Sequence, residues 1–139
     1  MTEQSPERPA HFESAYPLQA HIGFEMVEWT AERVVFHQEV AEHIGNRYGI
    51  PHGGIYAVLL DTAMGYAGCY TGDPAQKRMA MTLSLTVNFI SRPRGALLIA
   101  SASKRGGGRR TFFADGEVHD ETGELIATGS GSFRYRQSN

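Results

Sequence analysis

The stretch NRYGIPHGGIYAVLLDTAMGYAG, residues 46–68, decides the fold of this chain. Pro51 and the glycines around it end any earlier structure, and no further proline follows until Pro74. A helix can therefore begin at Gly53 or the next residue and run to about the end of the stretch. Every side of this helix is apolar except at one acid, Asp61, so the sequence predicts a helix that is buried all round.

Small residues accompany Asp61 on this predicted helix. At about 100° per residue, the stripe that holds the acid also holds Gly54, Ala57, Gly65 and Gly68. Three glycines weaken a helix by roughly 1 kcal/mol each relative to alanine, so we expect another backbone or a ligand along the stripe. A buried, unpaired carboxylate is costly, which makes Asp61 a candidate for chemistry. In the alternative interpretation Asp61 caps a loop, and the His52-Gly53-Gly54 step is only a tight turn.

Composition limits the classes of function. The 139 residues, 41% of them hydrophobic, fit one globular domain. A formal net charge of −2 gives no overall attraction to nucleic acid or membrane, and neither is expected as a partner. One cysteine, no secretory signal pattern and no long apolar run predict a soluble, cytoplasmic protein. Neither His37 nor His43 has a partner at metal-ligand spacing, so no metal site is expected.

The rest of the chain predicts a tail and a set of strands. Residues 1–17 are polar and contain three prolines, so we expect a flexible N-terminal tail followed by a single domain over 18–139. Strand-forming residues bounded by turn sequences occur at 21–29, 33–40, 79–90, 96–103, 111–119 and 124–135. This order predicts an α+β fold in which an antiparallel sheet of about five to six strands wraps one long central helix.

The clearest predicted strand begins at Met79. Its odd positions are apolar as far as Phe89, and its even positions are small or polar. We expect the apolar face to cover the helix. The opposite face, turned outward or toward a partner chain, would carry Thr82, Ser84, Thr86 and Asn88.

The start of the predicted helix offers an oxyanion hole. Glycines there leave backbone N–H groups free at the positive end of the helix dipole, where an oxygen that gains negative charge is stabilised. An ionised Asp61 can attack a carbonyl or take a proton from water, while Asn46 holds the water or the carbonyl by hydrogen bonds.

Gly53 and Asp61 cannot serve the same carbonyl within one chain. They are eight residues apart in the sequence, which is roughly 12 Å along a helix. A reacting atom should lie about 3 Å from each group, so the acid must come from a second copy of the chain. The predicted site therefore implies a dimer with antiparallel, two-fold-related helices.

The same residues stand at a spacing that is specific to one family: Asn46, Gly49, His52-Gly53-Gly54 and Asp61. With them, the chain resembles the PaaI-type hot-dog thioesterases, which hydrolyse acyl-coenzyme A, from about residue 22 to 135. Residues 88–93 and 110–132 match more loosely. The resemblance implies that Asp61 is the general base or nucleophile and that the Gly53 amide polarises the thioester carbonyl. It also implies that Asn46 orients the carbonyl or the water and that His52 supports the loop, with Gly54 in the same motif.

Family members also place a serine or threonine early in the third strand, near the attacking water. Thr82 matches that position best, and Ser84 is the second candidate. Some relatives carry a threonine one helical turn after the acid, where this chain has Gly65, so a hydroxyl at that position cannot take part.

Basic residues flank the glycine turn at 106–108: Lys104, Arg105, Arg109 and Arg110. Such a cluster suits phosphates, and the resemblance favours contact with those of coenzyme A, with Arg92 as a further candidate. An ordinary hairpin whose charges protect a sheet edge is the alternative. No separate cofactor is implied, because CoA is part of the substrate.

Two other functions fit parts of the pattern. A hot-dog enoyl-thioester hydratase or dehydratase also needs a helix end and an acid, but such relatives usually carry a catalytic histidine in a proline-rich or Asp-Asn-Pro context, which is missing here. A non-catalytic acyl-CoA-binding dimer explains the small residues but leaves Asp61 without a purpose. Neither the acyl group nor the choice between dimer and tetramer follows from the sequence.

Overall fold

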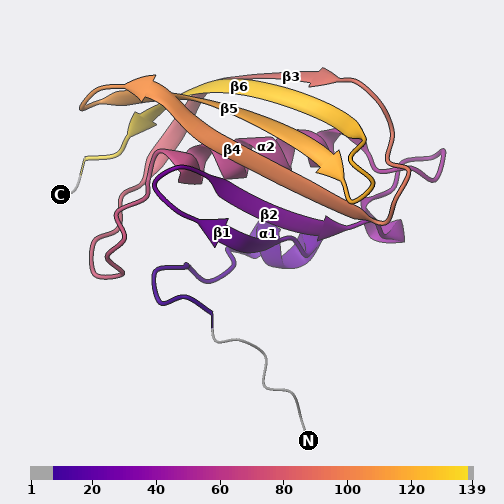
Figure 1. Ribbon diagram of the computed structural model, residues 1–139, viewed down its shortest axis with the longest axis horizontal. Coiled ribbons are helices and arrows are strands. Elements are labelled where there is room, and N and C mark those ends of the chain that lie inside the picture. Colours follow the sequence, from indigo (N-terminus) through magenta and orange to yellow (C-terminus); the bar gives the residue numbers. More distant parts are fainter. Residues whose placement is uncertain (1–7, 138–139) are drawn as a thin grey trace, which may run out of the picture.

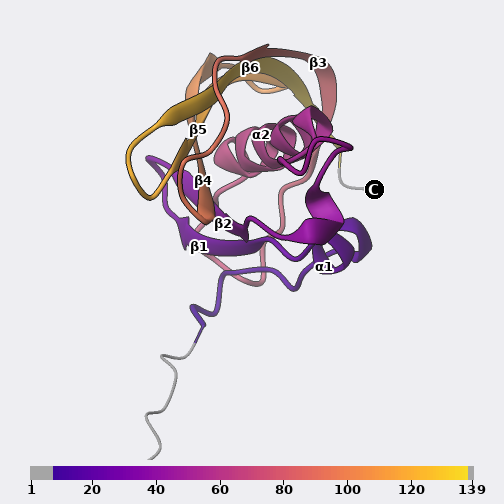
Figure 2. The same cartoon turned by 90° about the vertical axis from the view of Figure 1, so that its right-hand side faces the viewer.

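One long helix, α2 (Gly53–Ala67), lies in the curve of a six-stranded antiparallel sheet (Figure 1 and Figure 2). The computed structural model describes residues 8–137. The strands stand in the order β1-β2-β4-β5-β6-β3, each antiparallel to its neighbours. Their bounds are β1 Glu25–Trp29, β2 Val34–Glu39, β3 Ala80–Phe89, β4 Leu97–Gly107, β5 Thr111–Asp120 and β6 Leu125–Tyr135. The predicted α+β fold, with a sheet wrapped around one central helix, is confirmed.

Side-chain hydrogen bonds satisfy backbone groups at both ends of α2. His52 caps the first turn, because its Nδ1 accepts a hydrogen bond from the Gly54 N–H at 2.8 Å. At the other end the Tyr135 hydroxyl donates to the Gly68 carbonyl oxygen at 2.7 Å, which satisfies an acceptor that the helix leaves without a partner. The helix predicted from residue 53 to about 68 is confirmed.

Glycines on the strands let α2 approach the sheet closely. The fully buried face of the helix is formed by Leu59, Leu60, Ala63 and Met64. A Cβ at Gly116 of β5 would lie 3.0 Å from Leu60, and one at Gly129 of β6 would lie 3.1 Å from the same side chain. Each large apolar side chain buried in this way contributes about 1.5–3 kcal/mol to folding.

The other side of α2 is not buried within the chain. Asp61, Thr62, Gly65 and Tyr66 are only half-buried, and Gly54 is exposed. The prediction of a helix buried all round is therefore wrong for a single chain. The sheet ends at β3 on one side and at β1 on the other, so it covers only part of the helix.

A bulge in β3 changes which side chains face the helix. The register with β6 shifts between Thr82 and Ser84, and such a shift moves every later side chain to the opposite face. Thr82 turns toward α2 before the shift and Leu85 packs on the core after it, whereas Met81 and Leu83 are 51% and 54% exposed. The prediction that all odd positions cover the helix is wrong, because strict alternation assumes an unbroken ladder.

A short helix, α1 (Pro17–Ile22), precedes the sheet. It replaces the beginning of the strand that was predicted over 21–29, because a proline at the first position favours a helical start and Gly23, with φ +101°, ends it. Within residues 8–137, no helix is long and apolar enough to span a membrane.

The described part of the predicted tail contacts the domain. Phe12 and Tyr16 pack against the core, and His11 Nε2 lies 2.8 Å from the Trp29 carbonyl oxygen. The polarity and prolines of this segment led to the prediction of a loose tail, but its two aromatic side chains anchor it. Residues 1–7 of that prediction lie outside the described part of the chain.

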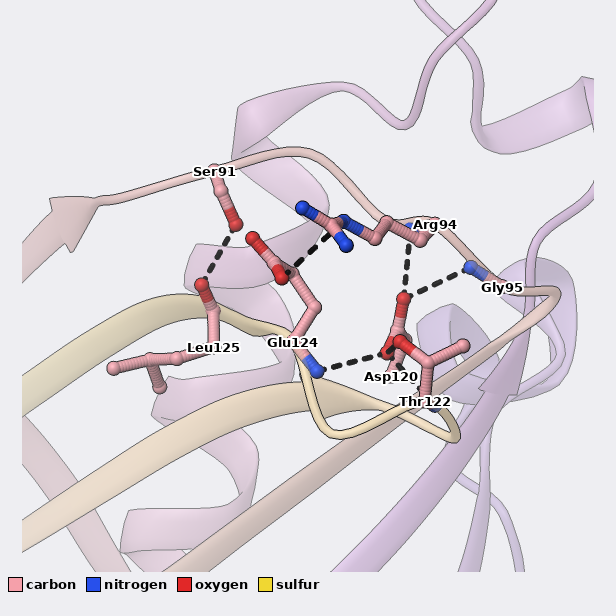
Figure 3. A network of polar contacts seen from close by, with 7 residues as sticks. All are labelled: Ser91, Arg94, Gly95, Asp120, Thr122, Glu124 and Leu125. Carbon is pink, nitrogen blue, oxygen red and sulfur yellow. Dashed lines mark hydrogen bonds and ion pairs between the residues drawn. The ribbon is translucent and has the colours of Figure 1, made fainter.

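A buried carboxylate ties the β3–β4 loop to the turn between β5 and β6 (Figure 3). Asp120 Oδ2 accepts hydrogen bonds from the N–H groups of Arg94 and Gly95 at 2.7 and 2.9 Å. Its Oδ1 accepts one from the Thr122 hydroxyl at 2.6 Å. The hydroxyl first, and then the backbone donors, hold the pKa of Asp120 well below its usual range. The loop that carries Arg92 is thereby fixed to the sheet.

Candidate active site

Asp61 lies in the middle of α2, on the half-buried side of the helix, next to the start of β3. Its Oδ1 accepts a hydrogen bond from the Thr82 hydroxyl at 2.6 Å. Ser84, the second predicted hydroxyl, does not contact Asp61. The bulge in β3 lies between Thr82 and Ser84, and Ser84 Oγ lies 2.8 Å from Ser132 Oγ. Of these two candidates, the structure brings Thr82 to the acid.

A surface cavity opens beside this pair. Helix α2 supplies Asp61 and Gly65 to its wall, β3 supplies Thr82, and the N-terminal segment supplies Glu13 and Tyr16. A ligand that enters the cavity can therefore reach the carboxylate of Asp61.

Tyr16 is held in place at this cavity. Its hydroxyl lies 2.6 Å from Thr62 Oγ1, and its ring packs edge-on against Phe24 with 6.1 Å between centroids. Burial, and to a lesser degree the charge of Asp61, raises the pKa of Tyr16. Burial also raises the pKa of Tyr66 to about 12 and that of Cys69 to about 11. These phenols and this thiol are therefore neutral near pH 7.

The N-terminus of α2 presents a backbone donor without a partner. Within residues 8–137, no protein acceptor takes the Gly53 N–H, whereas the Gly54 N–H is bound to His52. The ring of Phe89 lies over this turn, and a Cβ at Gly53 would come within 3.1 Å of it. The Gly53 N–H is thus available to an oxygen at the positive end of the helix dipole, while His52 and Gly54 form the cap.

Asn46 organises the loop before the helix. Its Oδ1 accepts hydrogen bonds from the N–H groups of Tyr48 and Ile50 at 2.9 and 3.3 Å. Gly49, with φ +81°, takes the conformation that this turn needs and that glycine adopts most easily. The side-chain amide of Asn46 has no acceptor among residues 8–137, so its N–H groups are available to a ligand.

These two groups of residues lie apart in one chain. Residues 46–54 take no part in the wall of the Asp61 cavity. Eight helical positions, or roughly 12 Å, separate Gly53 from Asp61. In the structure, Thr82 is hydrogen-bonded to Asp61 in the middle of α2. Asn46 and the capping residues His52 and Gly54 lie together at the N-terminus of the helix.

The predicted phosphate contacts lie at opposite ends of the domain. Arg92 follows β3, whose last residue covers the N-terminus of α2. Lys104, Arg105 and Arg109 lie on the β4–β5 hairpin, beside the C-terminal end of the helix. Arg105 is paired with Asp115 at 3.3 Å. The four residues do not form one cluster.

Tyr16, Thr62 and Arg78 are among the residues of the Asp61 cavity that were not predicted from the sequence. Tyr16 and Thr62 are 46 positions apart, so no local pattern connects them. Thr62 directly follows the acid, and this adjacency was the one signal that could have indicated it.

Comparison with known proteins identifies similar sequences. The sequence profile of the Thioesterase superfamily matches residues 48–127. The 1,4-dihydroxy-2-naphthoyl-CoA hydrolase of Listeria monocytogenes is 27% identical over 109 residues, which cover 78% of this chain and 87% of that protein.

Solved structures show the same fold. A Bacillus halodurans protein crystallised with CoA has a TM-score of 0.76 and 30% identity, and the match covers 90% of this chain and 82% of that one. The PaaI protein from the phenylacetic acid degradation operon of E. coli has a TM-score of 0.77 and 22% identity, covering 88% and 86% of the two chains. At this lower identity the second likeness shows the fold alone.

Proposed function

Because the chain belongs to the thioesterase superfamily and is a thioester hydrolase, we propose that it hydrolyses acyl-CoA thioesters to free acid and CoA. The observation that carries this proposal is the Asp61 carboxylate, held by the Thr82 hydroxyl beside an open cavity. The CoA-bound relative and the relative named as a CoA hydrolase support CoA as the thiol part of the substrate. No separate cofactor is proposed, since CoA belongs to the substrate.

Asp61 acts as general base or nucleophile in this proposal. Thr82 engages Oδ1 and leaves Oδ2 for the reaction. As a base, Asp61 takes a proton from water while the water oxygen bonds to the thioester carbon, and the carbonyl oxygen becomes an oxyanion. The carbon–sulfur bond then breaks, and the thiolate leaves with the proton that Asp61 received. As a nucleophile, Asp61 bonds to the same carbon, releases the thiolate and is freed by water.

The oxyanion is stabilised by the Gly53 N–H of a second copy of the chain. This donor has no protein partner among residues 8–137 and stands at the positive end of α2. Asn46 of the same copy orients the carbonyl or the water with its unpaired side-chain amide, and His52 and Gly54 hold the turn. The separation of Gly53 from Asp61 by roughly 12 Å supports this division between two chains.

The surface of the single chain supports a homo-oligomer. Strand β3 forms an edge of the sheet, and its outward side chains Met81 and Leu83 are 51% and 54% exposed. An unpaired edge with apolar side chains is suited to pairing with another copy. A second copy there would also cover the half-buried side of α2 that carries Asp61.

A thiol-release assay over a panel of aryl and aliphatic acyl-CoA thioesters tests the function. We expect turnover of at least one class, with one CoA thiol formed for each free acid. Hydration of an enoyl-CoA without thiol release would establish the hydratase instead. Binding of acyl-CoA with no release across the panel would establish a non-catalytic binding protein.

A further inference from the structure

The hydroxyls of Tyr16 and Thr62 form a pair at the wall of the Asp61 cavity. Tyr16 comes from the N-terminal segment and Thr62 from α2, and their hydroxyl oxygens lie 2.6 Å apart. Two hydroxyls carry two protons, and one of these protons makes the bond within the pair. No acceptor among residues 8–137 takes the other proton. The pair therefore offers one O–H donor to a ligand in the cavity.

The Tyr16 side chain is held firmly in this position. Its ring packs edge-on against Phe24, which packs in the same way against Phe36 with 5.6 Å between centroids. The Tyr16 carbonyl accepts a hydrogen bond from the Ala20 N–H at 2.9 Å, at the start of α1. Burial raises the pKa of Tyr16, so the phenol keeps its proton near pH 7. A donor that is already fixed loses little conformational freedom when it binds a ligand.

The pair lies close to the group that reacts. Thr62 directly follows Asp61 in α2, so their Cα atoms are about 3.8 Å apart. A thioester carbon about 3 Å from the Asp61 carboxylate is therefore only a few bonds away from the pair. The Thr82 hydroxyl is already bound to Asp61. The Tyr16–Thr62 pair thus remains as a free hydroxyl donor beside the first carbons of the acyl group.

The rest of the cavity suits a small acyl group. Gly65, Ala80 and Phe133 give it apolar surface. The charged residues of its wall, Glu13 and Arg78, also line a neighbouring cavity, so they lie where the two cavities adjoin. The volume is about 230 Å³, whereas a cavity of about 150 Å³ binds benzene. The space therefore fits one ring or a short chain.

We propose that the Tyr16–Thr62 pair selects the acyl group by donating a hydrogen bond to an oxygen on its third carbon, counted from the thioester carbon. This inference rests on the proposed acyl-CoA hydrolysis and assigns the pair to specificity, while Asp61 performs the chemistry. A carbonyl or hydroxyl oxygen at the third carbon accepts the bond. An acyl group without this oxygen displaces water from the pair and leaves the donor unpaired, which weakens its binding in the transition state.

Steady-state kinetics with two pairs of substrates test this role. 3-Oxobutanoyl-CoA is compared with butanoyl-CoA, and 2-hydroxybenzoyl-CoA with benzoyl-CoA, so that each pair differs only at the third carbon. The variant Tyr16→Phe/Thr62→Val removes both hydroxyls and keeps the shapes of both side chains. For the pair that wild type hydrolyses, we expect kcat/KM of the oxygenated substrate to fall about tenfold or more. The other substrate should change less than about twofold.

A second hydroxyl pair in the chain supplies the matched control. Ser84 and Ser132 have their oxygens 2.8 Å apart, and neither residue lines the Asp61 cavity. Ser84→Ala/Ser132→Ala should therefore leave the ratio of the two kcat/KM values unchanged. Thr62→Ser keeps the hydroxyl and should retain the wild-type ratio. Circular dichroism checks folding, and if the double variant is unfolded, Thr62→Val alone should lower the ratio by a smaller factor.

The ratio separates a specificity contact from a structural link. A folded variant that loses activity equally for both members of a pair, or that keeps the wild-type ratio, would overturn the proposal. Wild-type protein that releases thiol from other acyl-CoA thioesters but from none of these four would overturn it as well. If wild type releases thiol from no acyl-CoA, the proposed function itself fails, and this outcome is seen without any variant.

Discussion

The Thr82 hydroxyl engages only Oδ1 of Asp61, and the proposed mechanism uses the other carboxylate oxygen, Oδ2. An amide at this position has nearly the same size but can neither take a proton nor attack a carbonyl. Asp61→Asn is therefore expected to keep the fold and to lose about 100-fold or more in kcat. Circular dichroism and thiol release check both parts. Retention of more than about a tenth of wild-type kcat, a loss below ~1.4 kcal/mol in barrier, would exclude Asp61 as the central group.

Thr82 supplies the hydrogen bond that holds Asp61. Thr82→Val keeps the β-branched shape that suits a strand and removes only the hydroxyl. A hydrogen bond to a charged group contributes about 1.5–3 kcal/mol, so we expect kcat to fall about tenfold or more. Ser84→Ala is the matched control, because that hydroxyl contacts Ser132 instead. Equal losses in the two variants would show that the contact with Asp61 is not what matters.

The sequence predicts Asp61 as a site residue, but it does not predict all of the residues that the structure places around Asp61. Asp61, Asn46 and the helix-cap residues occur within one short stretch, where spacing and residue type are visible together. Tyr16 and Arg78 reach the cavity from segments that are distant in the sequence. Contacts of this kind depend on the path of the chain, which local patterns do not encode.

At the scale of elements, α2 was predictable and β3 was predictable only in part. The helix follows from its proline-free apolar run and the glycines at its start. The alternation of β3 predicted a strand correctly, but the bulge between Thr82 and Ser84 changed the faces. Nothing in the alternating pattern marks the position of a bulge, because bulges depend on the partner strand.

Gly68 limits how α2 meets the sheet, and two glycine substitutions test this. A Cβ at Gly68 would lie 2.3 Å from the Phe112 ring, whereas one at Gly65 would lie 3.8 Å from the Phe133 ring. Phe112 is fully buried and stacked on Phe133, so it cannot move aside easily. We expect Gly68→Ala to destabilise the fold by about 1–3 kcal/mol and Gly65→Ala to be neutral or mildly stabilising. Urea denaturation of both variants checks the difference, and equal stabilities would contradict it.

The hydrogen bonds that Asp120 accepts from Arg94, Gly95 and Thr122, here called the Asp120 clamp, make the stability of the fold depend on pH. The pKa of Asp120 is lower in the folded chain than in the unfolded chain, where the value is about 3.9. The stabilisation is therefore complete above about pH 4 and is lost as pH falls below this value toward the folded pKa. Glu121 accepts hydrogen bonds from the Ala96 and Leu97 N–H groups, and these bonds lower its pKa. The stabilisation from Glu121 is therefore also lost as the pH falls.

Asp120→Asn should therefore lower Tm at pH 7 by roughly 4 °C or more and flatten the fall of Tm below about pH 4. The amide offers one acceptor oxygen where the carboxylate offers two, so backbone donors on one side of the clamp lose their partner. Asp115→Asn is the control, because that carboxylate is exposed and its pair with Arg105 contributes little. Calorimetry from pH 7 to pH 2 measures both effects. A Tm profile for Asp120→Asn that parallels the wild-type profile would contradict the role of the clamp.

At the scale of the whole molecule, one chain holds both parts of the proposed site, and these parts do not meet within it. Asp61 lies on the side of α2 that the sheet leaves half-buried, and the Gly53 N–H lies roughly 12 Å away along the helix. Two copies with antiparallel helices would bring each acid to the other chain's helix end, which gives two sites for each dimer.

Mixing two inactive variants tests this central claim. One variant is Asp61→Asn, and the other is Gly53→Pro, which removes the oxyanion donor. Proline fits this position, because Gly53 has no positive φ and is the first helical residue, and His52 before it is extended with ψ 136°. Phe89 lies close to the new ring but is 62% exposed and free to shift.

The heterodimer of these variants has one site with both groups intact and one with both lesions. After circular dichroism and mass measurement confirm a folded heterodimer, we expect thiol release at about half of the wild-type rate per dimer. A folded heterodimer that stays as inactive as its parents would place Asp61 and Gly53 in the site of one chain and contradict the shared site.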